Sequence, residues 1–305
     1  MEKLNPDDNR NLNKAKIGWI GTGVMGAPMA QHLIESNFSL NVFTRSKYKA
    51  QSLIEAGARW CESPQKVAQQ SEIIFTMVGF PHDVEDVYFS NSGIFQGIKK
   101  GSIVVDMTTS EPQLAQKISE SAHQNASLSL DAPVSGGDIG ARNATLAIMV
   151  GGDRDAFDRI LPIFQIIGQN IKYMGAAGAG QHTKMSNQIL IASTMVGVVE
   201  SLLYAYKAGN DLGEVIEVIG KGAAASWSIN NLGRRIVKDD FDPGFFIKHF
   251  VKDMGIALKE AQHMKLSLPS LALAYQFYMS AMALGWENLG TQALYKVFQK
   301  MNDIE

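Results

Sequence analysis

The stretch KIGWIGTGVMGAPMAQHLIESN, residues 16–37, decides the fold of the first half of the chain. Its first five residues are mostly apolar and predict a short buried strand, and its second half has the pattern of a helix. Between them lie glycines in the spacing Gly21-x-Gly23-x-x-Gly26. In this position the first glycine permits a tight turn, the second lets a pyrophosphate approach the backbone, and the third allows close packing of helix and strand. We therefore expect this turn to bind a dinucleotide through Gly21, Gly23, Val24, Met25 and Gly26.

The alternation of strand and helix continues beyond this turn. Apolar runs of strand length recur at 40–44, 72–78, 101–109, 128–134, 146–152 and 170–175. The pattern predicts an α/β fold with a Rossmann-type, doubly wound sheet, in which ligands bind beyond the carboxyl ends of the strands. Met77, Val78 and Thr108 fall at such ends, and we expect them to contact the cofactor. Capping of the following helix is the structural alternative for Thr108.

The end of the second predicted strand bears on the type of cofactor. Sites that prefer NAD usually place an acid there for the ribose hydroxyls, whereas this chain has Phe43-Thr44-Arg45-Ser46-Lys47. Arg45, aided by Ser46, could hold a 2′-phosphate. We therefore expect NADP(H) to be preferred over NAD(H), the alternative being a solvated basic turn.

The second half of the sequence is helical. After Gly175 the strand signals stop, and helical patterns follow at 180–207, 211–220, 226–238, 245–264, 269–287 and 290–301. We expect a disordered extension at 1–15, a dinucleotide-binding domain at 16–176 and an all-α domain for substrate binding and dimerisation at 177–305. The helix over 180–207 is so apolar that later helices or a second subunit must cover it. This predicts a homodimer or homotetramer.

Composition excludes several classes of function. The formal net charge of the 305 residues is -2, which gives no support for nucleic-acid binding. The single cysteine, Cys61, rules out an intrachain disulfide, and no two of the six histidines have the spacing of metal ligands. The N-terminus lacks the apolar core of a secretory signal, and we expect no stretch long and apolar enough to cross a bilayer. A cytoplasmic protein without membrane contact is the prediction.

A further segment, Ser135-Gly136-Gly137, follows a predicted strand. Successive backbone N–H groups and a serine hydroxyl can form a cradle for a carboxylate, although an ordinary loop would also account for these residues.

Four motifs in order make the chain similar to the β-hydroxyacid dehydrogenases. They are the glycine turn, the segment Asp131–Ala141, the motif Gly178-x-Gly180-Gln181-x-x-Lys184, and Lys252-Asp253. The family includes 3-hydroxyisobutyrate dehydrogenase, tartronate semialdehyde reductase and the glyoxylate and succinic semialdehyde reductases. The resemblance runs from about residue 16 to residue 300.

The resemblance implies roles for individual residues. Lys184 matches the catalytic acid/base of the family, and burial of such a lysine would bring its pKa toward neutrality. Lys252 matches the lysine that reaches the cofactor near the nicotinamide. The carboxylate cradle would comprise Ser135, Gly136 and Gly137.

The residues one helical turn before and after Lys184 lie near it on the same helix and are further candidates for the site. Asn187 and Gln188 lie one turn beyond the lysine and would contact the substrate. The family commonly has two asparagines there, so Gln188 is a departure from its pattern. Gly180, one turn before the lysine, is expected to leave room for a ligand.

The sequence as a whole predicts an enzyme that interconverts a small β-hydroxyacid and its semialdehyde. A semialdehyde or glyoxylate reductase that uses NADPH is the main expectation, and an NAD-dependent 3-hydroxyisobutyrate dehydrogenase is the alternative. A catalytically silent dinucleotide-binding scaffold is a third reading, and the presence of Lys184 speaks against it.

Overall fold

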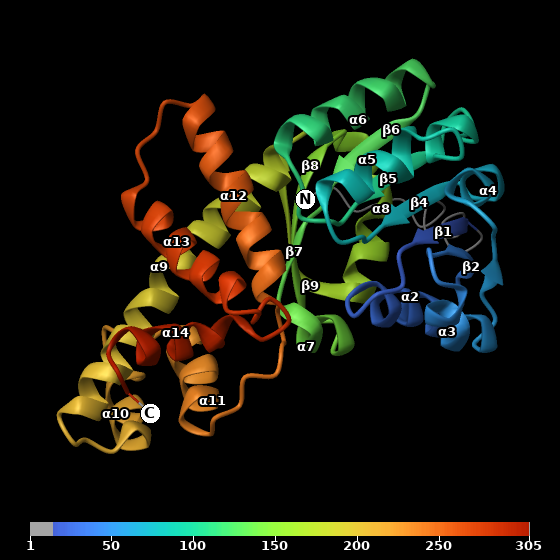
Figure 1. Cartoon of the computed structure of the whole chain (residues 1–305). Coiled ribbons are helices and arrows are strands. Elements are labelled where there is room, and N and C mark those ends of the chain that lie inside the picture. The colour runs from blue at the N-terminus through green and yellow to red at the C-terminus, as the bar shows by residue number, and fades with distance from the viewer. Residues whose placement is uncertain (1–14, 305) are drawn as a thin grey trace. The chain divides into compact units, whose positions relative to one another are not determined.

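The computed structural model describes residues 15–304 and contains two compact units that meet between Lys184 and Met185 (Figure 1). Apart from Ala15, the extension expected at 1–15 lies outside the described residues. Helix α9, Ala179–Lys207, begins in the first unit and continues into the second.

The first unit is built on a sheet of nine strands within residues 15–304. The strands run in the order β3-β2-β1-β4-β5-β6-β8-β7, and β9 pairs with β8. All pairs from β3 to β6 are parallel, whereas β8 is antiparallel to β6 and β7. The bounds are β1 Lys16–Ile20, β2 Ser39–Phe43, β3 Arg59–Trp60, β4 Ile73–Thr76, β5 Ile103–Asp106, β6 Leu128–Asp131, β7 Val134–Ser135, β8 Leu146–Gly152 and β9 Gly168–Gly175.

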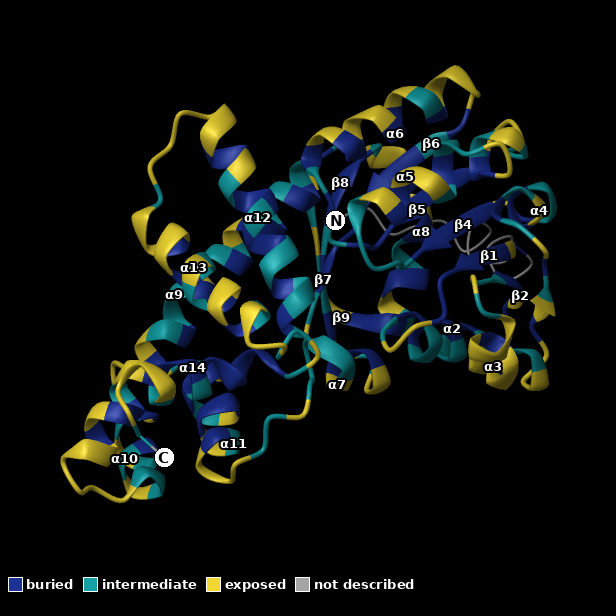
Figure 2. Ribbon diagram, in the orientation of Figure 1, coloured by how far each residue is buried: buried dark blue, intermediate teal, exposed yellow. Residues whose placement is uncertain are grey.

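Helices cover both faces of this sheet. Alternate residues of a strand point to opposite faces, so Trp19 of β1 packs with α2 and α8, whereas the next residue, Ile20, packs with α4, α5 and α6. The bounds are α2 Gly26–Glu35, α3 Gln51–Glu55, α4 Pro64–Gln70, α5 Pro81–Phe89, α6 Pro112–Gln124, α7 Gly137–Arg142 and α8 Arg154–Ile167. Figure 2 shows the strands buried and the outer faces of the helices exposed. The Rossmann-type fold expected from the sequence is confirmed.

The register of the parallel strands brings their carboxyl ends to one edge. Ile20 pairs with Phe43 and Thr76, Thr76 pairs with Asp106, and Asp106 pairs with Asp131. The segments that follow β1, β2, β4, β5 and β6 therefore all start at the same edge of the sheet, where ligands of such folds bind.

The second unit is helical and has its own core. Its core includes Phe250, Tyr278 and Leu294, each fully buried. Besides α9, its elements are α10 Leu212–Ile219, α11 Arg234–Val237, α12 Ile247–His263, α13 Pro269–Ala283 and α14 Leu294–Met301. The helix expected at 226–238 is a π-helical segment, Ser228–Gly233, followed directly by α11.

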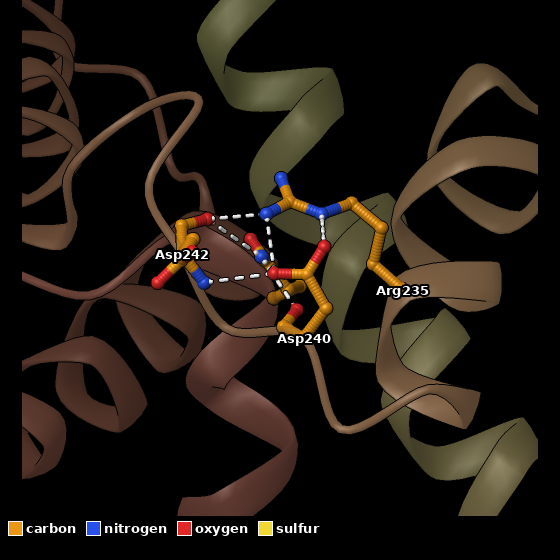
Figure 3. A network of polar contacts seen from close by, with 4 residues as sticks. Arg235, Asp240 and Asp242 are labelled. Carbon is orange, nitrogen blue, oxygen red and sulfur yellow. Dashed lines mark hydrogen bonds and ion pairs between the residues drawn. The ribbon is translucent and has the colours of Figure 1, made fainter.

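A polar network fixes the loop that leads into α12 (Figure 3). The guanidinium of Arg235 donates from Nε and Nη2 to the two carboxylate oxygens of Asp240, at 2.7 and 2.8 Å, and Nη2 also donates to the carbonyl of Asp242. Gln292 donates to the carbonyls of both Asp240 and Asp242. These bonds tie the end of α11 and the segment before α14 to one loop.

Helix α9 shows that the expectation of no stretch long and apolar enough to cross a bilayer is wrong. It has 29 residues and a mean hydropathy of 1.6 in its most apolar window, so it passes the test of length and composition for a membrane span. Core helices pass the same test, and α9 supplies Val199 and Leu202 to the core of the second unit. Length and composition alone therefore do not separate the two classes for this helix.

Candidate active site

The glycine turn between β1 and α2 shows why two of its three glycines are required by packing. Gly21 has a φ of +97°, and a Cβ there would lie 2.1 Å from the carbonyl oxygen of Met77. At Gly26 a Cβ would lie 2.1 Å from the carbonyl oxygen of Gly21. That same oxygen accepts a hydrogen bond from the indole of Trp19. The turn is thus closed tightly on strand β4 and on the start of α2.

The middle of the turn is open and fits a dinucleotide. A Cβ at Gly23 would meet no atom within 4 Å, so the backbone there is accessible to a phosphate. Beside it, the hydroxyl of Thr22 is buried and has no hydrogen-bond partner within residues 15–304. Val24 is 56% exposed, and Met25 is half-buried. The turn that would hold the pyrophosphate of NAD(P) therefore combines free space with an unsatisfied hydroxyl.

Arg45 lies just after β2, at the carboxyl edge, as expected, but it has a protein partner. Its Nη1 donates to Oδ1 of Asp83 at 3.0 Å. The arginine side chain is 83% exposed, whereas that of Asp83 is 9% exposed. The other carboxylate oxygen of Asp83 accepts the backbone N–H of Phe80 at the start of α5. Ser46 is half-buried next to the arginine. The sequence analysis missed Asp83, which lies 38 residues away from Arg45 along the chain.

Thr108 joins the ends of two neighbouring strands. Its hydroxyl accepts the backbone N–H of Val78 at 3.0 Å, and its own N–H donates to Asp106. The N-cap of α6 is Glu111, so the alternative that Thr108 caps this helix is wrong. Met77 and Val78 are half-buried at the end of β4, beside Gly21. The three predicted cofactor contacts after β4 and β5 are therefore adjacent at one edge.

The start of α9 is bound to the end of β6 by a buried carboxylate. Oδ1 of Asp131 accepts the N–H of Gly178, and Oδ2 accepts the N–H of Gln181, both at 2.8 Å. Burial raises the pKa of Asp131 to about 6, while the two backbone donors lower it. Backbone N–H groups in the first turn of a helix have no partner within the helix, and Asp131 satisfies two of them.

Gln181 binds the same helix start to the loop after β5. Its side chain is fully buried; Nε2 donates to the carbonyl of Thr108 at 2.8 Å, and Oε1 accepts the N–H of Ser110 at 3.0 Å. A Cβ at Gly180 would lie 2.4 Å from the carbonyl of Met149. The expectation that Gly180 leaves room for a ligand is wrong, because the backbone of β8 occupies that space.

Lys184 follows Gln181 by one turn of α9 and is 7% exposed. Residues three apart on a helix lie on the same face, so the lysine projects from the face that Gln181 fixes to the carboxyl edge of the sheet. A buried lysine at this edge meets the first requirement for a proton donor in the dinucleotide site.

The predicted carboxylate cradle lies at the end of β7. Ser135 and Gly137 are half-buried and Gly136 is exposed; the two glycines have φ values of +133° and +61°. They lead into the short helix α7, where Asp138 pairs with Arg142 at 2.7 Å. The backbone conformation is one that glycine adopts readily, and it leaves the loop partly accessible.

In the second unit, Gln188 is the centre of a polar chain between α9 and α12. Its Oε1 accepts Nδ2 of Asn187 at 2.8 Å, and its Nε2 donates to Oδ2 of Asp253 at 2.6 Å. Nζ of Lys252 lies 2.8 Å from Oδ1 of Asp253. Both oxygen and nitrogen of the Gln188 carboxamide are thus engaged within this unit, and its side chain is almost fully buried. The proposed substrate contact at this position stays a prediction.

A glycine turn with an open centre lies at the same edge of the sheet to which the start of α9, the helix of the buried Lys184, is bonded, and this arrangement is typical of a nicotinamide-dinucleotide-binding oxidoreductase. Comparison with known proteins gives the family. Residues 16–175 match the NAD-binding domain of 6-phosphogluconate dehydrogenase, and residues 178–298 match the NAD-binding domain of NADP-dependent 3-hydroxyisobutyrate dehydrogenase. The chain belongs to the β-hydroxyacid dehydrogenase family and is an oxidoreductase that acts on CH–OH groups.

Individual relatives agree with this assignment over nearly the whole chain. The probable 3-hydroxyisobutyrate dehydrogenase-like 1 of Arabidopsis thaliana is 50% identical over 96% of this chain and 87% of the relative. The 2-hydroxy-3-oxopropionate reductase of Escherichia coli is 38% identical over 94% of this chain and 98% of the relative. The solved 3-hydroxyisobutyrate dehydrogenase of Mycobacterium tuberculosis with L-serine has a TM-score of 0.86 and 26% identity, covering 94% of this chain and 99% of that one.

Proposed function

We propose that this protein is an NADPH-preferring reductase of a small semialdehyde or of glyoxylate, with Lys184 as the general acid. The observation that carries the proposal is the burial of Lys184 on a helix whose first turn is bound to the carboxyl edge of the sheet, the edge at which the dinucleotide turn lies.

Each group of residues has a task in this reaction. NADPH supplies the hydride to the carbonyl carbon of the substrate. The oxygen of that carbonyl then needs a proton, which Lys184 donates; in the oxidative direction the lysine accepts the hydroxyl proton. Ser135 and the two glycines after it bind the substrate carboxylate, and Asn187 contacts the substrate. Lys252 reaches the nicotinamide end of the cofactor.

The preference for NADPH rests on the chemistry at the end of β2. The chain places Arg45 and Ser46 there, and an arginine is suited to bind the 2′-phosphate with two parallel hydrogen bonds. The ion pair with Asp83 leaves the guanidinium 83% exposed. The exposed guanidinium is therefore accessible to a phosphate, while the buried carboxylate of Asp83 holds the arginine at the end of β2.

Semialdehyde reduction is favoured by the chemistry of a relative. The Escherichia coli protein is named for the reduction of 2-hydroxy-3-oxopropionate, which is tartronate semialdehyde. The Arabidopsis relative, named a probable 3-hydroxyisobutyrate dehydrogenase-like protein, favours oxidation of 3-hydroxyisobutyrate, the reaction of the second candidate. Both reactions would use Lys184, as the proton donor in reduction and as the proton acceptor in oxidation, and both would use the same carboxylate cradle. They differ in direction and in the side chain of the substrate.

The test is the oxidation of NADPH and, in parallel, of NADH. Glyoxylate, succinic semialdehyde, tartronate semialdehyde and methylmalonate semialdehyde are the four substrates. Lys184→Ala should abolish turnover and leave NADPH binding intact, whereas Lys207→Ala, at the exposed far end of the same helix, should behave as the wild type. Binding of NADPH without reduction of any of the four would overturn the substrate proposal, and equal turnover with both cofactors would overturn the preference.

We also propose that the protein forms a homodimer or homotetramer. The support is apolar surface on α9, where Leu190 is 69% and Tyr204 79% exposed. Light scattering after size-exclusion chromatography at micromolar concentration tests this, and a monomer would contradict it.

A further inference from the structure

We propose that Asp131 is a positioning residue for Lys184, so that its carboxylate, at the end of β6, determines where the catalytic lysine stands. The inference rests on the proposed role of Lys184. Asp131 itself touches neither substrate nor cofactor in this proposal and acts through the backbone of the first turn of α9.

The first step of the argument is that the carboxylate is fully committed to this helix start. Both of its oxygens accept backbone N–H groups of the first turn at 2.8 Å, Oδ1 from Gly178 and Oδ2 from Gln181. Asp131 is 3% exposed, so water does not compete for these bonds. Bonds from N–H groups to an ionised carboxylate are about twice as strong as those between neutral groups.

The second step is that the surroundings allow no other arrangement of the helix start. A Cβ added at Gly151 of β8 would lie 2.6 Å from Oδ1 of Asp131 and 2.7 Å from the backbone nitrogen of Gly180. A Cβ added at Gly180 would lie 2.8 Å from Oδ2 of the same carboxylate. Glycines are therefore required at both Gly151 and Gly180, next to the carboxylate of Asp131. These three residues are packed without space for a further side-chain atom between them.

The third step connects the packing around the start of α9 with the position of Lys184. Lys184 lies on the same helix, one turn after Gln181 and four residues after Gly180. A helix moves as a stiff body over such a length, so a shift of its first turn carries the lysine with it. Proton transfer requires hydrogen-bond distance to the substrate oxygen, and a misplacement by about 1 Å can lower a rate by about a hundredfold.

The experiment compares Asp131→Asn with a matched control, Asp153→Asn. Asp153 precedes α8 and accepts the N–H of Ser129 at 2.8 Å, so it is also a carboxylate that binds backbone, but it has no bond to α9 among residues 15–304. The asparagine at 131 keeps one acceptor and turns a donor toward the second N–H group. We expect kcat to fall about tenfold to a hundredfold. The KM for the substrate and the dissociation constant of NADPH, measured by fluorescence, should change less than threefold, and the control should keep its kcat.

Two outcomes for Asp131→Asn would overturn the inference. A fall in thermal stability with an unchanged kcat would show that Asp131 only supports the fold, and it would overturn the inference. A lost kcat together with lost NADPH binding would overturn it as well. If Asp131→Asn does not fold, Gln181→Met, which removes two hydrogen bonds from the same turn, must show the same loss of kcat. Retained turnover in Lys184→Ala, measured alongside, would instead refute the proposed function itself.

Discussion

Substitution of the second and third glycines of the dinucleotide turn should separate folding from cofactor binding. At Gly26 an added Cβ would lie 2.1 Å from the carbonyl oxygen of Gly21, which is backbone and cannot move aside. At Gly23 an added Cβ meets nothing within 4 Å, and the residue has no positive φ. The two positions are three residues apart in one turn, so each serves as the control for the other.

The magnitudes follow from these distances. Overlap in a packed region destabilises a protein by about 1–3 kcal/mol or more, and in Gly26→Ala it is offset by about 1 kcal/mol of helix propensity at most. Because the overlap at Gly26 is with backbone, we take the upper end of this range and expect Gly26→Ala to lower the free energy of unfolding by about 2 kcal/mol. Gly23→Ala should change it by less than about 1 kcal/mol, with a gain expected, because alanine reduces the freedom of the unfolded chain.

Gly23→Ala, the substitution with the smaller effect on stability, should have a large effect on cofactor binding. The methyl group of Gly23→Ala stands where the pyrophosphate approaches the backbone, so the dissociation constant of NADPH should rise at least about tenfold, or about 1.4 kcal/mol. Urea unfolding of the protein without cofactor and titration by NADPH fluorescence measure the two effects. Wild-type affinity for NADPH in Gly23→Ala, or a loss of stability there equal to that of Gly26→Ala, would refute this reasoning.

Three further predictions concern single side chains. The pKa of Asp131 is raised from 3.8 to about 6, so its contribution to stability is fully present below pH 3.8 and is lost as the pH rises through about 6. The stability of wild type relative to Asp131→Asn should therefore fall by about 2 kcal/mol between pH 4 and pH 7, as urea unfolding across that range would show. Arg45→Ala should raise the KM for NADPH about tenfold or more while the KM for NADH stays within about threefold, and equal effects on both would exclude a 2′-phosphate contact. Arg235→Lys loses the paired bonds to Asp240 and should lower the unfolding free energy by about 1 kcal/mol, with an unchanged urea midpoint as the contrary result.

The elements of the fold could be predicted from local pattern. The apolar run at 16–20 is β1, and the run at 146–152 is β8 with the same bounds. The helix expected at 180–207 is α9, which begins one residue earlier. Hydrophobic periodicity and the positions of turn glycines are properties of neighbouring residues, so the local sequence is enough to predict the bounds of these strands and helices. The two-residue strand β3 was missed, because two residues show no period.

The contacts that fix the candidate site could not be predicted in this way. Asp131 binds N–H groups 47 and 50 residues further along the chain, and Gln181 binds the carbonyl of a residue 73 positions earlier. No local pattern encodes such a distance. Gly180 shows the consequence: its missing side chain was assigned to a ligand, whereas the carbonyl of Met149 from β8 lies in that space. Only the tertiary structure shows whether a glycine is required by a close backbone contact, as at Gly180, or leaves open space, as at Gly23.

Two buried aspartates, one in each unit, make hydrogen bonds to helix α9. Asp131 binds the start of the helix that carries Lys184, and Asp253 lies 2.8 Å from the ammonium of Lys252. In the second unit the carboxamide of Gln188 donates to Asp253 from α9, so both aspartates are bonded to the same continuous helix. The carboxamide of Gln188 connects two polar side chains of this unit, since its amide donates to Asp253 while its oxygen accepts from Asn187. Helix α9 is therefore bonded to the end of β6 at its start and to α12 two turns further along, and each of these bonds ends on a buried aspartate.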